Sequence, residues 1–193
     1  MRSDMYEVEL KFVVTDVAAI GARFQQIGAT RLGVVGQCDL YFGHPARSFA
    51  NSDEALRVRS TDESHLVTYK GPVIDDATKM RREIEIGLQG DEQSAADFKE
   101  MLCALGFEPV REVKKRRQRF QLHWSEREFE LAIDEVAELG TFVELETLAT
   151  ADTRDHAREA VLQLAEQCAL RTPEKRSYLR MLLEQDAQQS AAT

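Results

Sequence analysis

Acidic and basic side chains alternate with apolar ones in the segment Tyr6–Val14. If this segment is a β-strand, Glu7, Glu9 and Lys11 lie on one face, because successive side chains of a strand point to opposite sides. Two carboxylates could then bind a divalent cation, and the ammonium could bind an anionic group. A strand with a solvated outer face shows the same pattern. This segment alone therefore does not separate a binding site from an ordinary surface.

The same alternation recurs in six further predicted strands. Together, one face of each strand provides seven acids and seven bases. The acids are Glu7, Glu9, Glu83, Glu85, Asp134, Glu144 and Glu146, and the bases are Lys11, Arg57, Arg59, Lys70, Arg81, Lys115 and Arg117. In the strand around Lys115, the opposite face with Lys114 and Arg116 is also charged, which leaves its register open. Solvated faces explain any one strand, since exposed ion pairs contribute little, but their recurrence favours a shared charged interior.

Periodicity and turn signals predict the elements that position these residues. The sequence predicts strands over residues 6–14, 34–42, 55–60, 65–71, 79–88, 108–123, 128–136 and 141–148. It predicts helices over residues 17–27, 91–105, 152–169 and 174–185, a loop over 43–54, and a frayed polar tail over 186–193. Few and short helical insertions favour antiparallel strands in a single domain over residues 1–185. We therefore expect a mainly β fold with packed helices (α+β), in which eight antiparallel strands close into a barrel or tunnel with the helices outside.

A charged interior of this size needs bound ions to compensate it. Clustered carboxylates favour Mg²⁺ or Mn²⁺, and paired arginines suit phosphate oxygens. Two divalent cations add about +4, which a polyphosphate of about −4 neutralises. This arithmetic fits a nucleoside triphosphate and inorganic tripolyphosphate equally well.

Composition excludes several other classes of protein. The formal net charge of −9 argues against a nucleic-acid binder, because neutralising phosphates requires a basic excess. No apolar run approaches the ~18 residues of a membrane span. The three cysteines are scattered without metal-ligand spacing, which predicts free thiols in a cytoplasmic setting. Glycine-rich phosphate loops are absent, so side chains must build any phosphate site.

Several of these segments together resemble one known family. The segment Glu7-Val8-Glu9-Leu10-Lys11 resembles the ExExK signature of the CYTH superfamily, the triphosphate tunnel metalloenzymes. Further similar segments follow in order: Ala55–Arg59, Thr68–Pro72, Arg82–Glu85, Lys115–Arg117 and Ile133–Glu146. The resemblance spans about residues 5 to 185. Within the superfamily, Gln37–Phe42 and Ser177–Leu183 resemble the class IV adenylate cyclase branch, which is close to the thiamine triphosphatase-like proteins.

The resemblance implies an enzyme that binds a triphosphate and Mg²⁺ or Mn²⁺ in its tunnel. It implies metal binding by Glu7, Glu9, Asp134, Glu144 and Glu146, and catalytic roles for Glu7, Glu9, Lys11 and Asp134. It implies triphosphate binding by Lys11, Arg57, Arg59, Lys70, Lys115 and Arg117, to which the alternation adds Arg81. Glu83 and Glu85 match additional tunnel acids. By resemblance the chain is a possible homodimer.

The residues leave three functions open. A class IV-like cyclase would convert ATP to cyclic AMP and pyrophosphate, whereas a triphosphatase would hydrolyse tripolyphosphate, thiamine triphosphate or a nucleoside triphosphate. A non-catalytic triphosphate binder is the third, although anion binding alone needs only the bases. Among the remaining residues, His44 is expected in a solvated loop, and Trp124 and Tyr178 in packing roles.

Overall fold

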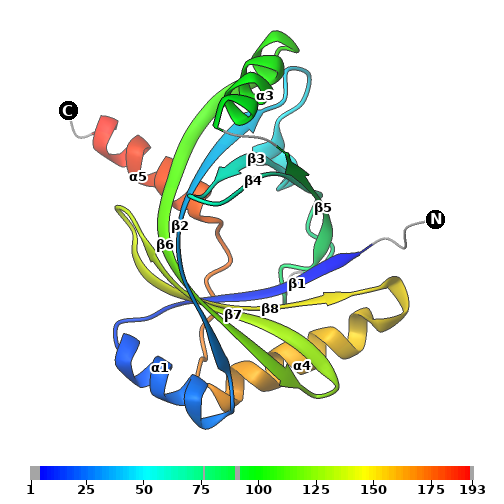
Figure 1. Ribbon diagram of the computed structural model, residues 1–193, viewed down its shortest axis with the longest axis vertical. Coiled ribbons are helices and arrows are strands. Elements are labelled where there is room, and N and C mark those ends of the chain that lie inside the picture. Colours follow the sequence, from blue (N-terminus) through cyan, green and yellow to red (C-terminus); the bar gives the residue numbers. More distant parts are fainter. Residues whose placement is uncertain (1–4, 76, 90–91, 192–193) are drawn as a thin grey trace.

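A closed barrel of eight strands forms the centre of the structure, a computed structural model that describes residues 5–75, 77–89 and 92–191 (Figure 1). Each strand pairs antiparallel with its neighbours in the order β1-β5-β4-β3-β2-β6-β7-β8. The strands are β1 (Tyr6–Val13), β2 (Thr30–Gly43), β3 (Ala55–Ser60), β4 (His65–Lys70), β5 (Arg81–Leu88), β6 (Glu108–Trp124), β7 (Arg127–Val136) and β8 (Gly140–Ala149). The predicted mainly β fold with packed helices is confirmed.

Helices lie outside the barrel (Figure 1). They are α1 (Val17–Gln26), α2 (Phe49–Ser52), α3 (Glu92–Ala104), the 3₁₀ turn η1 (Ala151–Thr153), α4 (Arg154–Gln167) and α5 (Tyr178–Ala191). Asp16 caps the start of α1, since its carboxylate accepts a hydrogen bond from the backbone N–H of Ala19 at 2.9 Å. Gly28 follows this helix with φ of +86°, a conformation that favours glycine. Within the described ranges, no helix is long and apolar enough to cross a membrane.

The apolar face of β1 explains why its charged face points inward. Val8, Leu10 and Phe12 are buried in one cluster with residues of α4, including Val161 and Leu164. Burying a side chain of this size contributes about 1.5–3 kcal/mol. Because successive residues of a strand alternate in direction, seating this face on α4 directs Glu7, Glu9 and Lys11 into the barrel.

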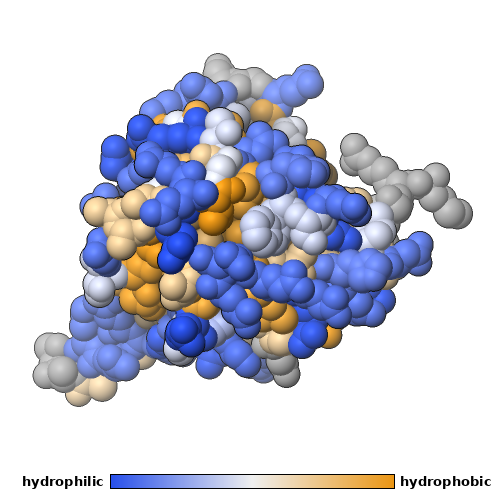
Figure 2. Space-filling model, turned by 90° about the horizontal axis from the view of Figure 1, so that it is seen from below, coloured by the Kyte–Doolittle hydropathy of each residue, from blue (hydrophilic) through white to orange (hydrophobic). Residues whose placement is uncertain are grey.

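Two further apolar clusters pack helices α5 and α3 against the strands of the barrel. Helix α5 contributes Tyr178, Met181 and Leu182 to a cluster with Val113 of β6 and Phe142 of β8. Helix α3 contributes Leu102 to the third cluster, which covers β2 and β3. Seen from below in Figure 2, the outer surface is predominantly hydrophilic, with apolar side chains visible between the polar ones. Helices α3 and α4 thus bury outward apolar faces of the strands. Helix α5 instead packs on Val113 and Phe142, which lie on the same strand faces as Lys115 and Glu144, so it covers part of the charged interior.

The C-terminal segment differs from the prediction. A helix was expected over residues 174–185 and a frayed tail from residue 186, but α5 begins at Tyr178 and continues to Ala191. Residues before α5 are extended instead, because the backbone N–H of Glu174 donates to the carbonyl of Lys11 at 2.7 Å. The end of the helix is held by Asp186, which accepts a hydrogen bond from Arg111 Nε at 3.0 Å. Residues 192–193 lie outside the described part.

Other differences are smaller. The loop expected over residues 43–54 contains the short helix α2, and the strand expected at 34–42 begins four residues earlier, at Thr30. The helix expected over 152–169 is divided into η1 and α4. Of the helix expected at 91–105, the first residue lies outside the described ranges, and α3 covers Glu92–Ala104.

Candidate active site

The interior of the barrel holds a cavity of about 1170 Å³. Thirteen of the fourteen predicted charged residues line it. The exception is Asp134, which is completely buried behind the cavity wall. The register of β6 left open by the sequence is also resolved, because Lys115 and Arg117 are buried and Lys114 and Arg116 are exposed.

Asp134 is the centre of a buried cluster on β6, β7 and β8. Its carboxylate accepts hydrogen bonds from Lys115 Nζ at 2.8 Å, from Arg117 Nε and Nη2 at 2.7 and 2.6 Å, and from the Tyr178 hydroxyl at 3.1 Å. Arg117 also pairs with Glu144. Burial alone would raise the pKa of Asp134, but Arg117 and Lys115 outweigh it and lower that pKa. The predicted metal-binding and catalytic roles of Asp134 stay predictions.

A second cluster joins β1, β4 and β5. Lys70 pairs with Glu7 and, at 2.9 Å, with Glu83, which lies directly opposite it in the β4–β5 register. Arg81 Nε lies 4.0 Å from Glu7, and its Nη1 donates to the carbonyl oxygen of Asp53 at 3.4 Å. Glu7 is thus already paired with a base.

Asp39 of β2 was missed by the sequence prediction. It is 1 % exposed and accepts hydrogen bonds from Arg59 Nε and Nη2 at 2.6 and 2.7 Å, and from Arg57 Nη1 at 3.3 Å. Burial alone would raise the pKa of Asp39, but the two guanidinium groups outweigh it and hold that pKa well below its ordinary value. It lies on the inward face of its strand, opposite Arg59 in the β2–β3 register. The alternation rule would have placed it inside once the register of β2 was known.

Glu9 and Glu146 differ from the other acids of the interior. They lie directly opposite each other on β1 and β8, and neither forms an ion pair within the described residues. Burial, together with the nearby carboxylates of Glu7, Glu83 and Glu9, raises the pKa of Glu146 well above its ordinary value despite the opposing effect of Lys70. Unpaired facing carboxylates of this kind fit a divalent cation.

The remaining predicted metal ligands are less free to bind an ion in this arrangement. Glu7 forms an ion pair with Lys70, and Glu144 forms one with Arg117. Asp134 is paired with Lys115 and Arg117. Among residues 5–75, 77–89 and 92–191, no three His, Cys, Asp or Glu side chains converge closely enough to hold a metal ion. Glu9 and Glu146 are accordingly the two residues that fit the ion best.

The C-terminal segment and the α2 loop complete the cavity wall. The Tyr178 ring packs under two ammonium groups, 4.1 Å from Lys11 Nζ and 5.0 Å from Lys115 Nζ. Tyr178 thus has the packing role expected from the sequence, and its hydroxyl also reaches the buried cluster. His44 lines the cavity and packs edge-on against Phe107.

Glu85 and Lys79 extend the charged lining. Glu85 is exposed and accepts a hydrogen bond from Thr68 Oγ1 at 3.2 Å. Lys79 lines the cavity and was missed as a site residue. It is two positions before Arg81, so the alternation that placed Arg81 inside would have found it as well.

These features define a class of protein: closed antiparallel barrels with a charged, ligand-sized interior. Within that class the chain belongs to the CYTH domain family, whose family model matches residues 5–178. Members of this family are adenylate cyclase or triphosphatase-like enzymes, and its triphosphate tunnel metalloenzymes use divalent metal ions.

Individual relatives cover nearly the whole chain. The "Putative adenylate cyclase" of Methanocaldococcus jannaschii is 34 % identical over 161 residues, which are 83 % of this chain and 87 % of the relative. The solved structure of the PH1819 protein from Pyrococcus horikoshii has 34 % identity and a TM-score of 0.81, covering 93 % of this chain and 99 % of that one. A more distant structure shares the fold at 17 % identity with a TM-score of 0.59, covering 95 % and 96 %. It is that of a Hippeastrum protein named "Putative adenylyl cyclase" and described as having a dominant triphosphatase activity.

Proposed function

We propose that this chain is a divalent-metal-dependent adenylate cyclase that converts ATP to cyclic AMP and pyrophosphate inside its barrel. The observation that carries the proposal is the cavity, whose wall contains all seven predicted bases and six of the seven predicted acids. Its volume of about 1170 Å³ is somewhat larger than that of ordinary small-molecule sites, which measure roughly 300–1,000 Å³, so a nucleoside triphosphate has room inside it. The name of the Methanocaldococcus jannaschii relative supports the same activity.

The apolar part of the cavity supports an organic triphosphate over inorganic tripolyphosphate. Leu32, Val34 and Leu66 line it, in addition to the charged residues. A bare polyphosphate has no group that would contact these side chains favourably. A nucleoside attached to the triphosphate provides such a group, because its base has two apolar faces.

The basic residues would bind the phosphates and stabilise the charge that develops in the reaction. In cyclisation, the ribose 3′-oxygen bonds to the α-phosphorus, the bond from that phosphorus to the pyrophosphate oxygen breaks, and the 3′-hydroxyl proton passes to water. Lys115 and Arg117 are held rigidly by Asp134. They can therefore meet the charge on the leaving pyrophosphate without reorganising. A divalent ion held by Glu9 and Glu146 would supply Lewis-acid stabilisation of phosphate oxygens and lower the pKa of the attacking hydroxyl.

Triphosphate hydrolysis is the second candidate. The same bases and acids serve it, since only the attacking oxygen and the phosphorus it reaches differ. The dominant triphosphatase activity described for the Hippeastrum protein of the same fold supports keeping this candidate.

A product assay distinguishes these functions. The purified protein is incubated with ATP, tripolyphosphate or thiamine triphosphate together with Mg²⁺ or Mn²⁺, and the products are separated. Cyclic AMP with pyrophosphate supports the cyclase, and orthophosphate supports the triphosphatase. Binding without turnover would refute both enzymatic functions in favour of a binding protein.

The variant Glu9→Gln tests whether turnover occurs at this site. It should abolish metal-dependent turnover and leave the fold intact, because it removes one carboxylate that has no ion-pair partner in the described part of the chain. Glu135→Gln is the matched control, since Glu135 lies on the opposite, exposed face of β7. Unchanged turnover of Glu9→Gln at saturating metal would place the reaction elsewhere.

A further inference from the structure

Lys79 is a cavity residue to which the proposed function has so far given no role. It lies in the loop between β4 and β5, two residues before β5 begins, and it lines the cavity together with Arg81. Its backbone N–H donates to the carbonyl of Glu9 at 3.1 Å. This bond places Lys79 at the junction of β1 and β5.

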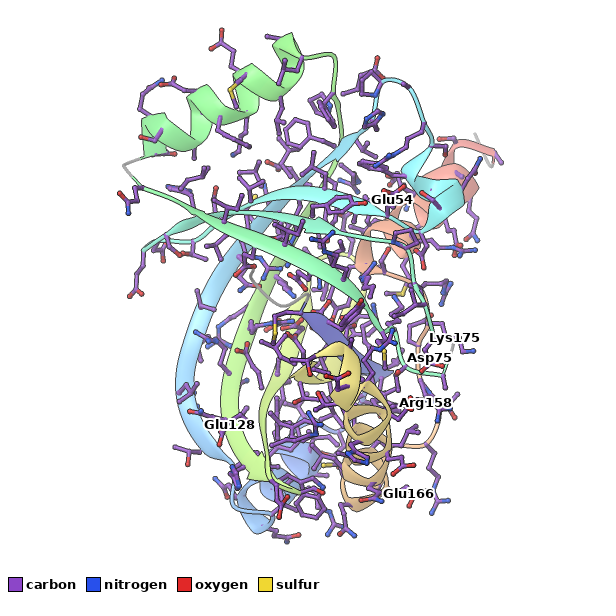
Figure 3. All side chains as sticks on the ribbon, turned by 90° about the vertical axis from the view of Figure 1, so that its right-hand side faces the viewer. Glu54, Asp75, Glu128, Arg158, Glu166 and Lys175 are labelled. Atoms are coloured by element: carbon purple, nitrogen blue, oxygen red, sulfur yellow. The ribbon has the colours of Figure 1, made fainter. Side chains whose placement is uncertain are left out.

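The loop that carries Lys79 is well anchored on both sides. Thr78 is 1 % and Met80 4 % exposed, so the residues flanking Lys79 are both buried. The Asp75 carboxylate accepts hydrogen bonds from the backbone N–H and the hydroxyl of Thr78, at 3.1 and 2.6 Å. It also accepts one at 3.1 Å from Arg158 Nε on α4, and Figure 3 shows these two residues close together on the outside of the barrel. Lys79 therefore has a fixed backbone position at the cavity.

The ammonium group of Lys79 differs from those of the other cavity lysines. Lys70 pairs with Glu7 and Glu83, Lys115 pairs with Asp134, and Lys11 donates to a backbone carbonyl at 2.5 Å. In the part of the chain that the structure describes, the Lys79 ammonium has no hydrogen-bond or ion-pair partner.

The surroundings of the Lys79 ammonium group also leave its positive charge poorly compensated. Lys79 is partly buried, and the positive charges of Lys11 and Arg81 lie close enough to act on its ammonium group. A partly buried cation without a partner is costly, and an anionic ligand would compensate it.

We propose that Lys79 is a further substrate-binding residue, which contacts the triphosphate together with Lys11 and Arg81 at the junction of β1 and β5. Lys11 and Arg81 also lack a close carboxylate partner among the residues that the structure describes, where the shortest such distance is the 4.0 Å from Arg81 Nε to Glu7. Glu9 lies beside this group, because its carbonyl accepts the hydrogen bond from the Lys79 backbone, and Glu146 lies directly opposite Glu9 in the β1–β8 register. The inference rests on the proposed function, because it assumes that a triphosphate enters the cavity.

The test is calorimetric titration with tripolyphosphate in EDTA, which measures phosphate binding separately from metal binding and turnover. Lys79→Ala should weaken binding about 10-fold to 100-fold, the usual contribution of a charge-assisted hydrogen bond. Lys79→Arg should recover most of the affinity. Lys114→Ala is the control, because it removes the same charge from the outer face of the barrel, where Lys114 is 65 % exposed. Lys79→Gln, closer in size to lysine, replaces the alanine variant if the latter does not fold.

Each outcome decides a different point. Wild-type affinity in Lys79→Ala or Lys79→Gln would overturn the assignment of Lys79 and leave the proposed function intact. Equal losses in the Lys79 variants and Lys114→Ala would also overturn it, since net charge would then explain the effect. If the wild-type chain binds neither tripolyphosphate nor ATP, the proposed function is refuted, and the inference with it.

Discussion

The substitution Glu146→Gln should stabilise the metal-free protein and remove its stabilisation by metal ions. Glu146 lies directly opposite Glu9 in the β1–β8 register and has no ion pair in the described ranges. Directly opposite side chains in a sheet have Cβ atoms about 5 Å apart. Two unit charges at that separation repel by about 1 kcal/mol in water and ~3 kcal/mol at an effective dielectric constant of 20. The variant removes this repulsion, so its free energy of unfolding should exceed that of the wild type by an amount within this range.

The gain should depend on pH in a defined direction. The pKa of Glu146 is raised well above its ordinary value by burial and by Glu7, Glu83 and Glu9. A group with a raised folded-state pKa stabilises the fold fully below its unfolded pKa, and this stability is lost as the pH rises through the folded pKa. The wild-type protein without metal should therefore lose stability as the pH rises from about 4.5, and Glu146→Gln should lose less.

Thermal unfolding in EDTA and in Mg²⁺ or Mn²⁺ measures both effects. For a chain of this size, 1 kcal/mol corresponds to roughly 2–4 °C. Glu146→Gln should consequently unfold ~2–12 °C above the wild type in EDTA at pH 8. Metal ions at a hundred times their dissociation constant stabilise a protein by about 2.7 kcal/mol, and the variant should lose most of this increase. Equal melting temperatures in EDTA, together with a full metal response in the variant, would refute the reasoning; Glu135→Gln is the control.

Three further substitutions test how the cavity residues are held. Asp39→Asn leaves two buried guanidinium groups without their counter-ion, which should cost about 3–5 kcal/mol of stability. The melting temperature should therefore fall by ~6–20 °C, and added tripolyphosphate should restore part of this loss. Tyr178→Phe removes the hydroxyl that donates to Asp134 and should cost about 1 kcal/mol in urea unfolding. Arg158→Ala removes a partly exposed anchor of Asp75 and should cost under about 1 kcal/mol. Its KM for the triphosphate should nevertheless rise several-fold; an unchanged KM would show that this pair does not position the loop.

The charged interior was predictable because it depends on a rule with a period of two. Once Val8 and Leu10 are assigned to the core, Glu7 and Glu9 must face the other way, whatever the rest of the chain does. Since seven strands carried the same signal, a closed barrel was the arrangement that gave their charged faces a common interior. The sequence therefore predicted which residues would meet.

Which acid pairs with which base inside the barrel was not predictable in the same way. Asp39 contacts Arg59 because β2 lies beside β3, and its role depends on strand order and register. The start of α5 was misplaced because the segment before it pairs with β1, through the Phe12–Pro173 bridge and the bond from Glu174 to Lys11. A local helical pattern contains no information about that distant competitor.

The closure of the barrel between β1 and β5 has a consequence for its dynamics. In the described ranges, only Tyr6 and Glu7 of β1 pair with β5, whereas β1 and β8 pair along the whole of β1. This seam is therefore the place where the ring is expected to open first, and its amides should exchange with solvent sooner than those of the β1–β8 ladder. Lys11 lies on one side of the seam and Lys79 with Arg81 on the other. A polyanion bound between them would link the two sides of the seam. Ligand binding should therefore reduce local opening of the barrel, and release of the ligand should restore it.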